Sequence, residues 1–408
     1  MIILIPIFSD AFLHPLHKDN DLSLLYVRHV GDKESIDEIK NDHTSFYITP
    51  DVKKIKHLFP DTRLIDVNYL HWNDKNVPMD LENIRVNSYD FFHTKYYNIK
   101  KLNEIIPISK HKEYCDRVFD KIVEYIDTVY ESKYHSDVIN AFHSIENNGV
   151  KVSDDVCDIF DVRVKKHISD GKLYSNYNLT TTTGRPSNSF GTVNFAALPP
   201  EKRTAIIPEN DYLVDFDFDA YHLRLIGNLV GFDFDSGDWG GKSVHEYFAY
   251  RYGCSYEESK QKTFQILYGG IREEHSKISS FFPKTLDYIN KKWREINTHN
   301  LVYTDIYRRK LLFKNYDDLN RNKLFNYLIQ AYETESNIKK ILSIQDYLYD
   351  KKTKLVLYGY DSFLFDFSKQ DGVEILTEIK NILERENQLT KSKMGLNYGE
   401  MNDITKRL

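Results

Sequence analysis

The chain has 408 residues, of which 41% are hydrophobic and 28% are charged, and its formal net charge is −6. These values are typical of a globular protein with two or three domains, and they exclude a disordered chain and a purely electrostatic, tail-like nucleic-acid binder. Three cysteines are too few for a disulfide framework or a zinc site, which favours a reducing compartment.

No apolar run approaches the ~20 residues that span a bilayer, and the N-terminus lacks a basic leader, so we expect a cytoplasmic protein without membrane contact. The composition, rich in Asn, Lys, Ile and Tyr, suits the AT-rich genome of a phage or plasmid.

The first 110 residues alternate short β-type runs with turn-rich polar stretches, which predicts a small α/β domain. The predicted strands are residues 1–8, 22–30, 45–48 and 63–67. From residue 110 the apolar residues follow helical spacing, as in Val118, Ile122 and Ile126. A further helix ends at Gly149, in the usual position of a C-terminal stop.

Residues 213–219 form an apolar strand with three alternating acids, Asp215, Asp217 and Asp219. Side chains alternate along a strand, so the three carboxylates would share one face and repel one another unless a cation neutralises them. The alternative is a charged outer face of an edge strand.

Residues 354–367 have the pattern of an apolar hairpin with Asp361 at its bend. A carboxylate between two buried strands is costly unless it is paired or bound to metal. Acids from two distant strands fit a two-metal phosphoryl-transfer site, because Mg²⁺ prefers oxygen ligands.

Residues 255–270 read as a helix in which Lys260, Phe264 and Tyr268 lie four apart on one face. A lysine can bind a triphosphate, and aromatic faces can stack on a base. The alternative is an amphipathic helix with a lysine at its edge. Residues 260–310 hold eleven Lys and Arg against five Asp and Glu, which fits either a basic groove or a solvated helical face.

Seven separated segments, in this order, resemble those of family A DNA polymerases. They are I-E-N-N-G-V-K-V (145–152), T-G-R-P-S (183–187), N-F-A-A-L-P (194–199), D-F-D-A-Y-H-L-R (217–224), K-x3-F-x3-Y-G (260–269), N-x3-Q (326–330) and Y-D-S (360–362).

The resemblance implies an α+β, right-hand polymerase fold with an antiparallel-sheet palm, helical fingers, a reduced thumb and a small N-terminal α/β domain. The domains would be 1–110 N-terminal, 111–182 helical connector and reduced thumb, 183–238 first palm part, 239–322 fingers and 323–408 second palm part.

It also implies the site residues. Asp217, Asp361 and the carbonyl of Phe218 would bind two Mg²⁺ ions, with Mn²⁺ as a substitute. Catalysis would depend on Asp217, Asp361 and Lys260. The incoming nucleotide would meet Lys260, Phe264, Tyr268, His222 and His245. Primer and template would meet Arg185, Asn194, Asn326, Gln330 and Tyr360.

The departures from the family pattern concern contacts with substrate. His222 replaces the glutamate that screens the ribose 2′ position, and Tyr256 stands where a fingers arginine is expected. Ala196 and Ala197 replace polar residues that contact the duplex. Only 30 residues, 153–182, occupy the place of the helical thumb, so we expect low processivity and a processivity or replisome partner.

Residues 1–110 occupy the place of a proofreading exonuclease, whose chemistry needs an Asp-x-Glu at a strand end and further acids. Asp10 has no such partner, and Asp80-Leu-Glu82 does not follow an apolar strand. Val118 falls where an acid belongs after Glu113. The domain is therefore interpreted as a decayed exonuclease-like module, with an unrelated module or an active exonuclease as alternatives.

The predicted function is template-dependent DNA synthesis from dNTPs on primer-template DNA, without proofreading. The alternatives are an RNA-synthesising or sugar-tolerant polymerase, suggested by His222 and the Tyr-Asp-Ser segment, and a catalytically silent nucleic-acid-binding scaffold.

Overall fold

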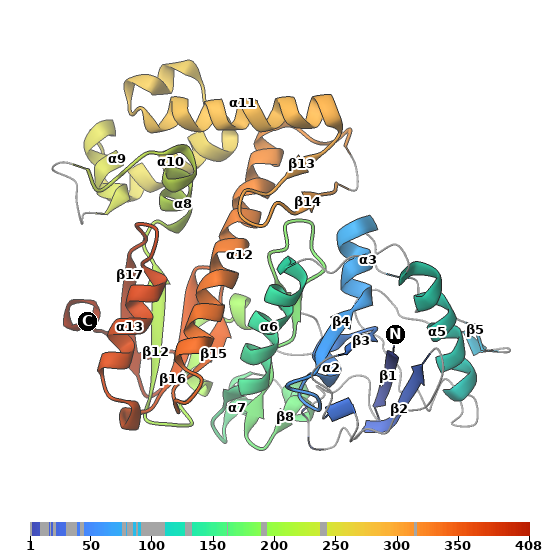
Figure 1. The fold of residues 1–408 in the computed structure, drawn as a ribbon. Coiled ribbons are helices and arrows are strands. Elements are labelled where there is room, and N and C mark those ends of the chain that lie inside the picture. Colours follow the sequence, from blue (N-terminus) through green and yellow to red (C-terminus); the bar gives the residue numbers. More distant parts are fainter. Residues whose placement is uncertain are drawn as a thin grey trace. The chain divides into compact units, whose positions relative to one another are not determined.

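The computed structural model describes residues 133–160, 162–188, 194–236, 243–313 and 316–408 and, nearer the N-terminus, residues 2–8, 16, 18, 22–29, 39–40, 45–75, 79, 85–86, 89–90 and 111–126. The chain divides into two compact units (Figure 1). The first comprises Met1–Thr180, Ser187–Glu209 and Asn397–Glu400, and the second comprises Thr181–Pro186, Asn210–Leu396 and Met401–Leu408. Within the described part of the chain, no helix combines the length and apolar character needed to cross a bilayer.

The first unit contains a four-stranded sheet of order β2-β1-β3-β4. Strands β1 and β2 are antiparallel, whereas β3 pairs in parallel with both β1 and β4. Helix α5 packs on β1 and β2, and the buried side chains of Ile3, Ile5, Val118 and Ile122 belong to one core. The four strands predicted from the sequence are present, and α5 completes their core.

The bounds of the elements in this unit are β1 Ile2–Phe8, β2 Leu22–His29, β3 Phe46–Thr49, α2 Val52–Ile55, β4 Arg63–Asp66, α3 Val67–Lys75, β5 Arg85–Val86, β6 Tyr89–Asp90, α5 His111–Ile126, α6 Lys133–Asn148, β7 Val150–Lys151, α7 Val156–Ile159, η2 Val162–His167, β8 Ile168–Ser169, β9 Lys172–Leu173, β10 Tyr177–Asn178, β11 Ser187–Asn188, η3 Phe195–Ala197 and η4 Pro200–Ala205, where η marks a 3₁₀ helix.

Helix α6 ends where the sequence predicts. Gly149 follows its last residue with a φ of +64°, and a β carbon at this position would lie 2.9 Å from the ring of Tyr174. Only glycine fits such a stop without strain. Between residues 153 and 182, the described residues form only the short helix α7, one 3₁₀ helix and strands of two residues.

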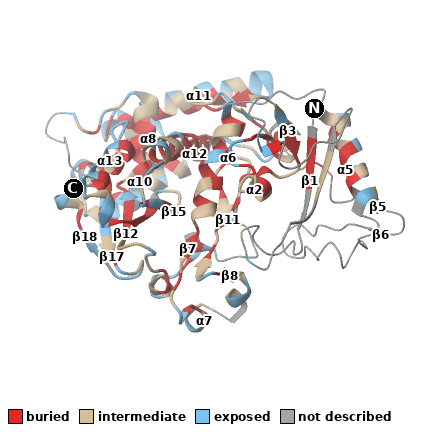
Figure 2. Ribbon diagram, turned by 60° about the horizontal axis from the view of Figure 1, so that its bottom comes forward, coloured by how far each residue is buried: buried red, intermediate tan, exposed pale blue. Residues whose placement is uncertain are grey.

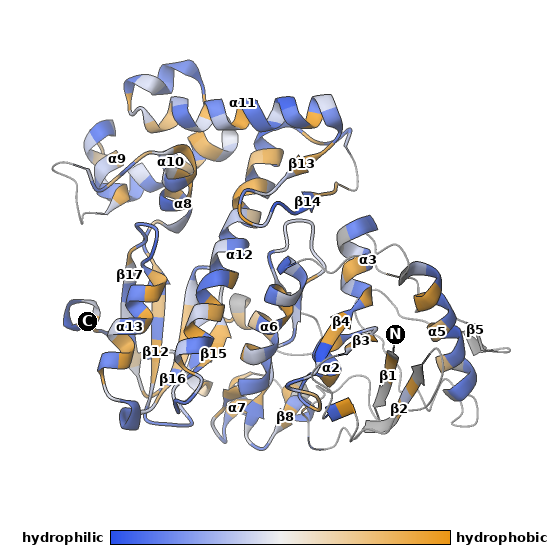
Figure 3. Cartoon of the chain, in the orientation of Figure 1, coloured by the Kyte–Doolittle hydropathy of each residue, from blue (hydrophilic) through white to orange (hydrophobic). Residues whose placement is uncertain are grey.

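The second unit is organised around a five-stranded sheet of order β15-β16-β12-β17-β18. All four pairings are antiparallel. Strand β12 lies at the centre, and its Phe216 and Phe218 meet Phe365 and Phe363 of β16 edge to face. Strands β12, β15 and β16 are largely buried (Figure 2). Of these, β15 and β16 carry the hydrophobic colour in Figure 3.

Helices α8, α9, α10, α11 and α12 of the same unit pack around a largely aromatic core. Phe248, Phe281, Phe282 and Phe325 are fully buried there. The long helix α12 contacts α8, α10 and α11 along its length and also contacts α13. It therefore connects the helical part of the unit to the part that contains the sheet (Figure 1).

The bounds of the elements in the second unit are β12 Tyr212–Phe218, α8 Tyr221–Val230, α9 Val244–Tyr252, α10 Tyr256–Gly269, η6 Glu273–Lys277, α11 Phe281–His299, β13 Val302–Tyr303, β14 Lys310–Leu311, α12 Arg321–Tyr347, β15 Lys354–Tyr358, β16 Ser362–Phe367, η7 Lys369–Asp371, α13 Glu374–Leu383, β17 Thr390–Gly395, β18 Met401–Asp403 and η8 Thr405–Arg407.

Candidate active site

Two carboxylates from distant parts of the sequence lie at one end of the central strand pair. Asp217 is the Cα partner of Ser362 in the β12–β16 pairing, and the N–H of Phe218 donates to the carbonyl oxygen of Asp361 at 2.9 Å. Asp361 occupies the tight turn between β15 and β16, next to Tyr360, which has a φ of +71°. Both carboxylates are exposed to solvent, so the hairpin presents Asp361 at its tip rather than between two buried strands.

The negative charges of Asp217 and Asp361 repel each other. The pKa of Asp217 is raised to about 6, first by partial desolvation and second by the charge of Asp361. The charges of Lys393 and Lys391 have the opposite effect and lower this pKa. Desolvation also raises the pKa of Asp361. A divalent cation would relieve this repulsion.

The donors present fit magnesium. Mg²⁺ is commonly held by one or two carboxylates together with substrate phosphates rather than by an all-protein cage. Among the described residues there is no group of three or more His, Cys, Asp or Glu side chains that could hold a metal ion by themselves.

The three acids predicted on the β12 segment have different surroundings. Asp215 is buried, whereas Asp217 is exposed. Asp219 lies beyond the strand end and is paired with Lys391 of β17, whose Nζ is 2.7 Å from its carboxylate. Lys391 is also the Cα partner of Asp217 in the β12–β17 pairing. The sequence reasoning did not identify this cation beside the two carboxylates.

Helix α10 has the predicted start, stop and aromatic face. Ser255 caps it in a capping box with Glu258, and Gly270 follows its last residue. The rings of Phe264 and Tyr268 are nearly parallel, with centroids 5.9 Å apart, while Lys260, one turn earlier, is exposed. The helix thus presents a cation and two stacked rings in sequence.

His245 of α9 lies behind this face. It is only 3% exposed, and its ring lies 5.5 Å from that of Tyr256 and 6.0 Å from that of Phe264. Burial lowers its pKa, so the ring is neutral near pH 7. In the structure its contacts are with aromatic rings, and Tyr256 forms part of this packing.

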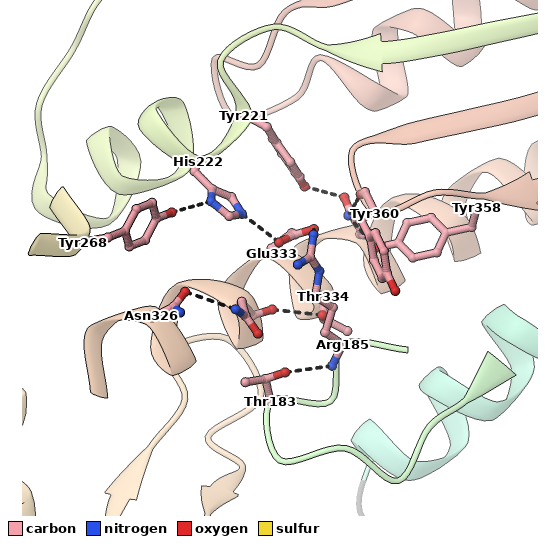
Figure 4. A network of polar contacts seen from close by, with 12 residues as sticks. Thr183, Arg185, Tyr221, His222, Tyr268, Asn326, Glu333, Thr334, Tyr358 and Tyr360 are labelled. Carbon is pink, nitrogen blue, oxygen red and sulfur yellow. Dashed lines mark hydrogen bonds and ion pairs between the residues drawn. The ribbon is translucent and has the colours of Figure 1, made fainter. Parts of the chain in front are cut away.

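His222 of α8 contacts both α10 and α12. Its Nδ1 is 2.6 Å from the hydroxyl of Tyr268, and its Nε2 is 2.9 Å from a carboxylate oxygen of Glu333 (Figure 4). Glu333 was not predicted as a site residue. Its only signal in the sequence is helical spacing, since it follows Asn326 by seven residues on what proved to be one continuous helix.

Arg185 continues this network on the other side of Glu333. Its guanidinium lies 3.4 Å from Glu333 and 3.9 Å from the ring centroid of Tyr360. The backbone carbonyl of Tyr360 accepts a hydrogen bond from Asn337 at 2.8 Å. Arg185 and Tyr360 therefore lie together beside the turn that carries Asp361.

The remaining predicted contacts divide between the two units. Gln330 donates to Asn326 at 3.1 Å along α12, close to Thr334, whose hydroxyl donates to the carbonyl of Gln330 (Figure 4). Asn194 is exposed, precedes the 3₁₀ helix η3 and belongs to the first unit. The structure thus collects the predicted residues in the second unit, with the exception of Asn194.

Among the acids considered for exonuclease chemistry, only Glu113 belongs to the described part of the chain. Asp10, Asp80 and Glu82 lie outside the described residues. Glu113 is paired with Arg117 on α5 at 3.4 Å, and Val118 is buried in the core of the first unit.

Comparison with known proteins reveals a likeness in fold. No model of a known protein family matches the sequence, and no curated protein matches it. Among solved structures, the chain is similar to the POL domain of Pol1 from M. smegmatis in complex with DNA primer-template and dNTP, with a TM-score of 0.66 and 11% sequence identity over 98% of this chain and 96% of that chain. The chain therefore has a mixed α+β fold similar to that of a DNA polymerase domain.

Proposed function

We propose that the chain is a template-dependent DNA polymerase of the family A type, which adds deoxynucleotides to a primer 3′-hydroxyl by two-metal-ion nucleotidyl transfer. The observation that supports this best is the position of Asp217 and Asp361 at one end of the central sheet, in the same unit as the Lys260, Phe264 and Tyr268 face of α10. That unit would comprise palm and fingers.

The two carboxylates and the carbonyl of Phe218 would hold the ions. Bound there, Mg²⁺ would supply the positive charge that activates the primer hydroxyl and stabilises the leaving pyrophosphate. Desolvation and, second, the charge of Asp361 raise the pKa of Asp217, which supports a site that is completed by cations.

The other side chains would act by positioning. Lys260 would bind the triphosphate as a point charge, and Lys391 would add a second cation beside the carboxylates. The parallel rings of Phe264 and Tyr268 would support the nascent base pair, with His245 behind them. Arg185, Asn326, Gln330 and Tyr360, and Asn194 of the first unit, would contact primer or template.

The likeness to a polymerase domain solved with primer-template and dNTP supports the same classes of ligand for this chain. We further propose that the first unit has no proofreading activity, because Val118 is buried in an apolar core where the exonuclease motif would need an acid. The short elements of residues 153–182 support a reduced thumb and dependence on a processivity partner.

Primer extension tests the proposal. The full chain, a labelled primer-template and Mg²⁺ are incubated with each dNTP singly and with all four. Incorporation of only the templated nucleotide, lost on addition of EDTA, is the expected result. No extension in Mg²⁺ or Mn²⁺, or extension that ignores the template, would contradict it.

A further inference from the structure

A fully buried carboxylate connects the nucleotide side of the site to the primer side. Glu333 is 0% exposed and has two partners from distant segments. Its Oε2 is 2.9 Å from Nε2 of His222, and its Oε1 is 3.4 Å from the guanidinium of Arg185 (Figure 4). A buried charge of this kind is costly unless it is paired and hydrogen-bonded.

His222 occupies the position that a nucleotide sugar would face. On one side it touches Tyr268, part of the stacked aromatic face where a base would lie. On the other, Glu333 and Arg185 lead to Tyr360, the neighbour of Asp361, where the α-phosphate would react. In any nucleotide the sugar lies between base and α-phosphate, so it would pass His222.

The imidazole of His222 has no nitrogen left for a substrate. Because a carboxylate accepts hydrogen bonds, Nε2 of His222 carries a hydrogen atom and donates a hydrogen bond to Glu333. Nδ1 is hydrogen-bonded to the hydroxyl of Tyr268, as acceptor in the neutral ring or as donor in the charged one. The ring is therefore held at both ends, and it can neither swing aside nor offer a nitrogen to a 2′-hydroxyl.

We propose that Glu333 is a positioning residue that makes the site selective for deoxyribonucleotides. It would hold the ring of His222 in a fixed position beside the sugar, as a wall whose two ring nitrogens are already hydrogen-bonded. This rests on the proposed polymerase function. A ribose hydroxyl that is removed from water and meets such a wall is left without a partner, which disfavours the ribonucleotide, whereas the deoxyribose places only a CH₂ group there.

The test compares incorporation of matched dNTP and rNTP by the full chain. Glu333→Met keeps the side-chain volume but removes the acceptor, which frees Nε2–H of His222. Glu333→Gln keeps an oxygen that can accept from Nε2. Glu335→Met is the matched control, because Glu335 is an equally buried acid on the same helix that pairs with Arg309 at 3.5 Å. Melting curves establish that each variant is folded. If Glu333→Met is unfolded, Glu333→Ala takes its place.

The readout is the ratio of kcat/KM for dNTP to kcat/KM for rNTP. We expect this ratio to fall by about tenfold or more in Glu333→Met and to stay within about threefold of wild type in Glu333→Gln and Glu335→Met. An unchanged ratio in Glu333→Met, or an equal fall in Glu335→Met, overturns the role of Glu333 and leaves the polymerase proposal standing. Wild-type protein that incorporates neither nucleotide refutes the polymerase proposal itself.

Discussion

Asp217 and Asp361 both have exposed side chains, and desolvation together with the charge of Asp361 raises the pKa of Asp217. We expect Asp217→Ala and Asp361→Ala each to abolish primer extension, because each would remove a proposed ligand of the two ions. In EDTA the melting temperature should hold or rise, because the substitution also relieves repulsion. Extension assays and melting curves check both effects, with the exposed Asp287→Ala of α11 as control. Wild-type-like incorporation by either variant would contradict the site assignment.

His143 of α6 gives the first unit a defined response to acid. Burial, together with the charges of Lys56 and Lys53, lowers its pKa from the usual 6.5 to about 3. A depressed pKa in the folded state means that the neutral ring contributes stability above pH 6.5, and this contribution is lost as the pH falls from 6.5 towards 3.

His143→Gln should therefore flatten the pH dependence of thermal stability. Between pH 7 and pH 5.5 the melting temperature of the wild type should fall by roughly 2–4 °C more than that of the variant. The exposed His299→Gln of α11 is the control and should follow the wild type. Parallel curves for wild type and His143→Gln would show that the histidine does not titrate as inferred.

Sequence spacing predicts those site residues whose relation is local. Lys260, Phe264 and Tyr268 share a face because the helix repeats, and the alternation of β12 separates its acids from Phe216 and Phe218. Glu333 could not be predicted in this way. Its partner His222 is 111 residues away in the sequence, and only the packing of α12 against α8 brings them together. For the same reason, nothing in the spacing identified Lys391 beside Asp219.

At the scale of elements, α10 offers a matched pair of lysines. Lys260 lies on the face of Phe264 and Tyr268, whereas Lys262 is two residues further on, lies on another face and approaches the ring of Tyr252 at 5.8 Å. We expect Lys260→Ala to lower kcat/KM for dNTP by roughly 10–100-fold, because in the proposed site its charge would meet negative charge that grows in the transition state. Lys262→Ala should change it by less than about threefold. Equal effects of the two variants would mean that the helix does not direct Lys260 to the triphosphate.

The first unit has the strands that its sequence predicts, and position 118 of helix α5 is a buried valine rather than an acid. We expect the chain to show no Mg²⁺-dependent 3′→5′ degradation of single-stranded DNA. The assay uses a 5′-labelled oligonucleotide and both the wild type and Asp217→Ala, so that any activity of the second unit is removed. Degradation that persists in Asp217→Ala would restore the active-exonuclease alternative.

For the molecule as a whole, the feature that would most limit the proposed polymerase activity is its hold on the product duplex. The described residues between 153 and 182 form no α-helix longer than four residues, so they provide no long helix that could lie along the duplex. Each lost phosphate contact lowers DNA affinity and flattens its dependence on salt. We therefore expect distributive synthesis, with short products after a single binding event and binding lost at modest salt.

The experiment is extension by full-length protein on a long primed template, with an excess of unlabelled trap DNA added together with the dNTPs. A fragment that starts near residue 110 is unsuitable, because α5 shares the core of β1 and β2 and its removal from them would expose apolar surface. Products of a few nucleotides that lengthen when the trap is omitted are the expected result. Products of hundreds of nucleotides in the presence of the trap would show that the chain holds DNA without a long thumb, and the argument for a processivity partner would fail.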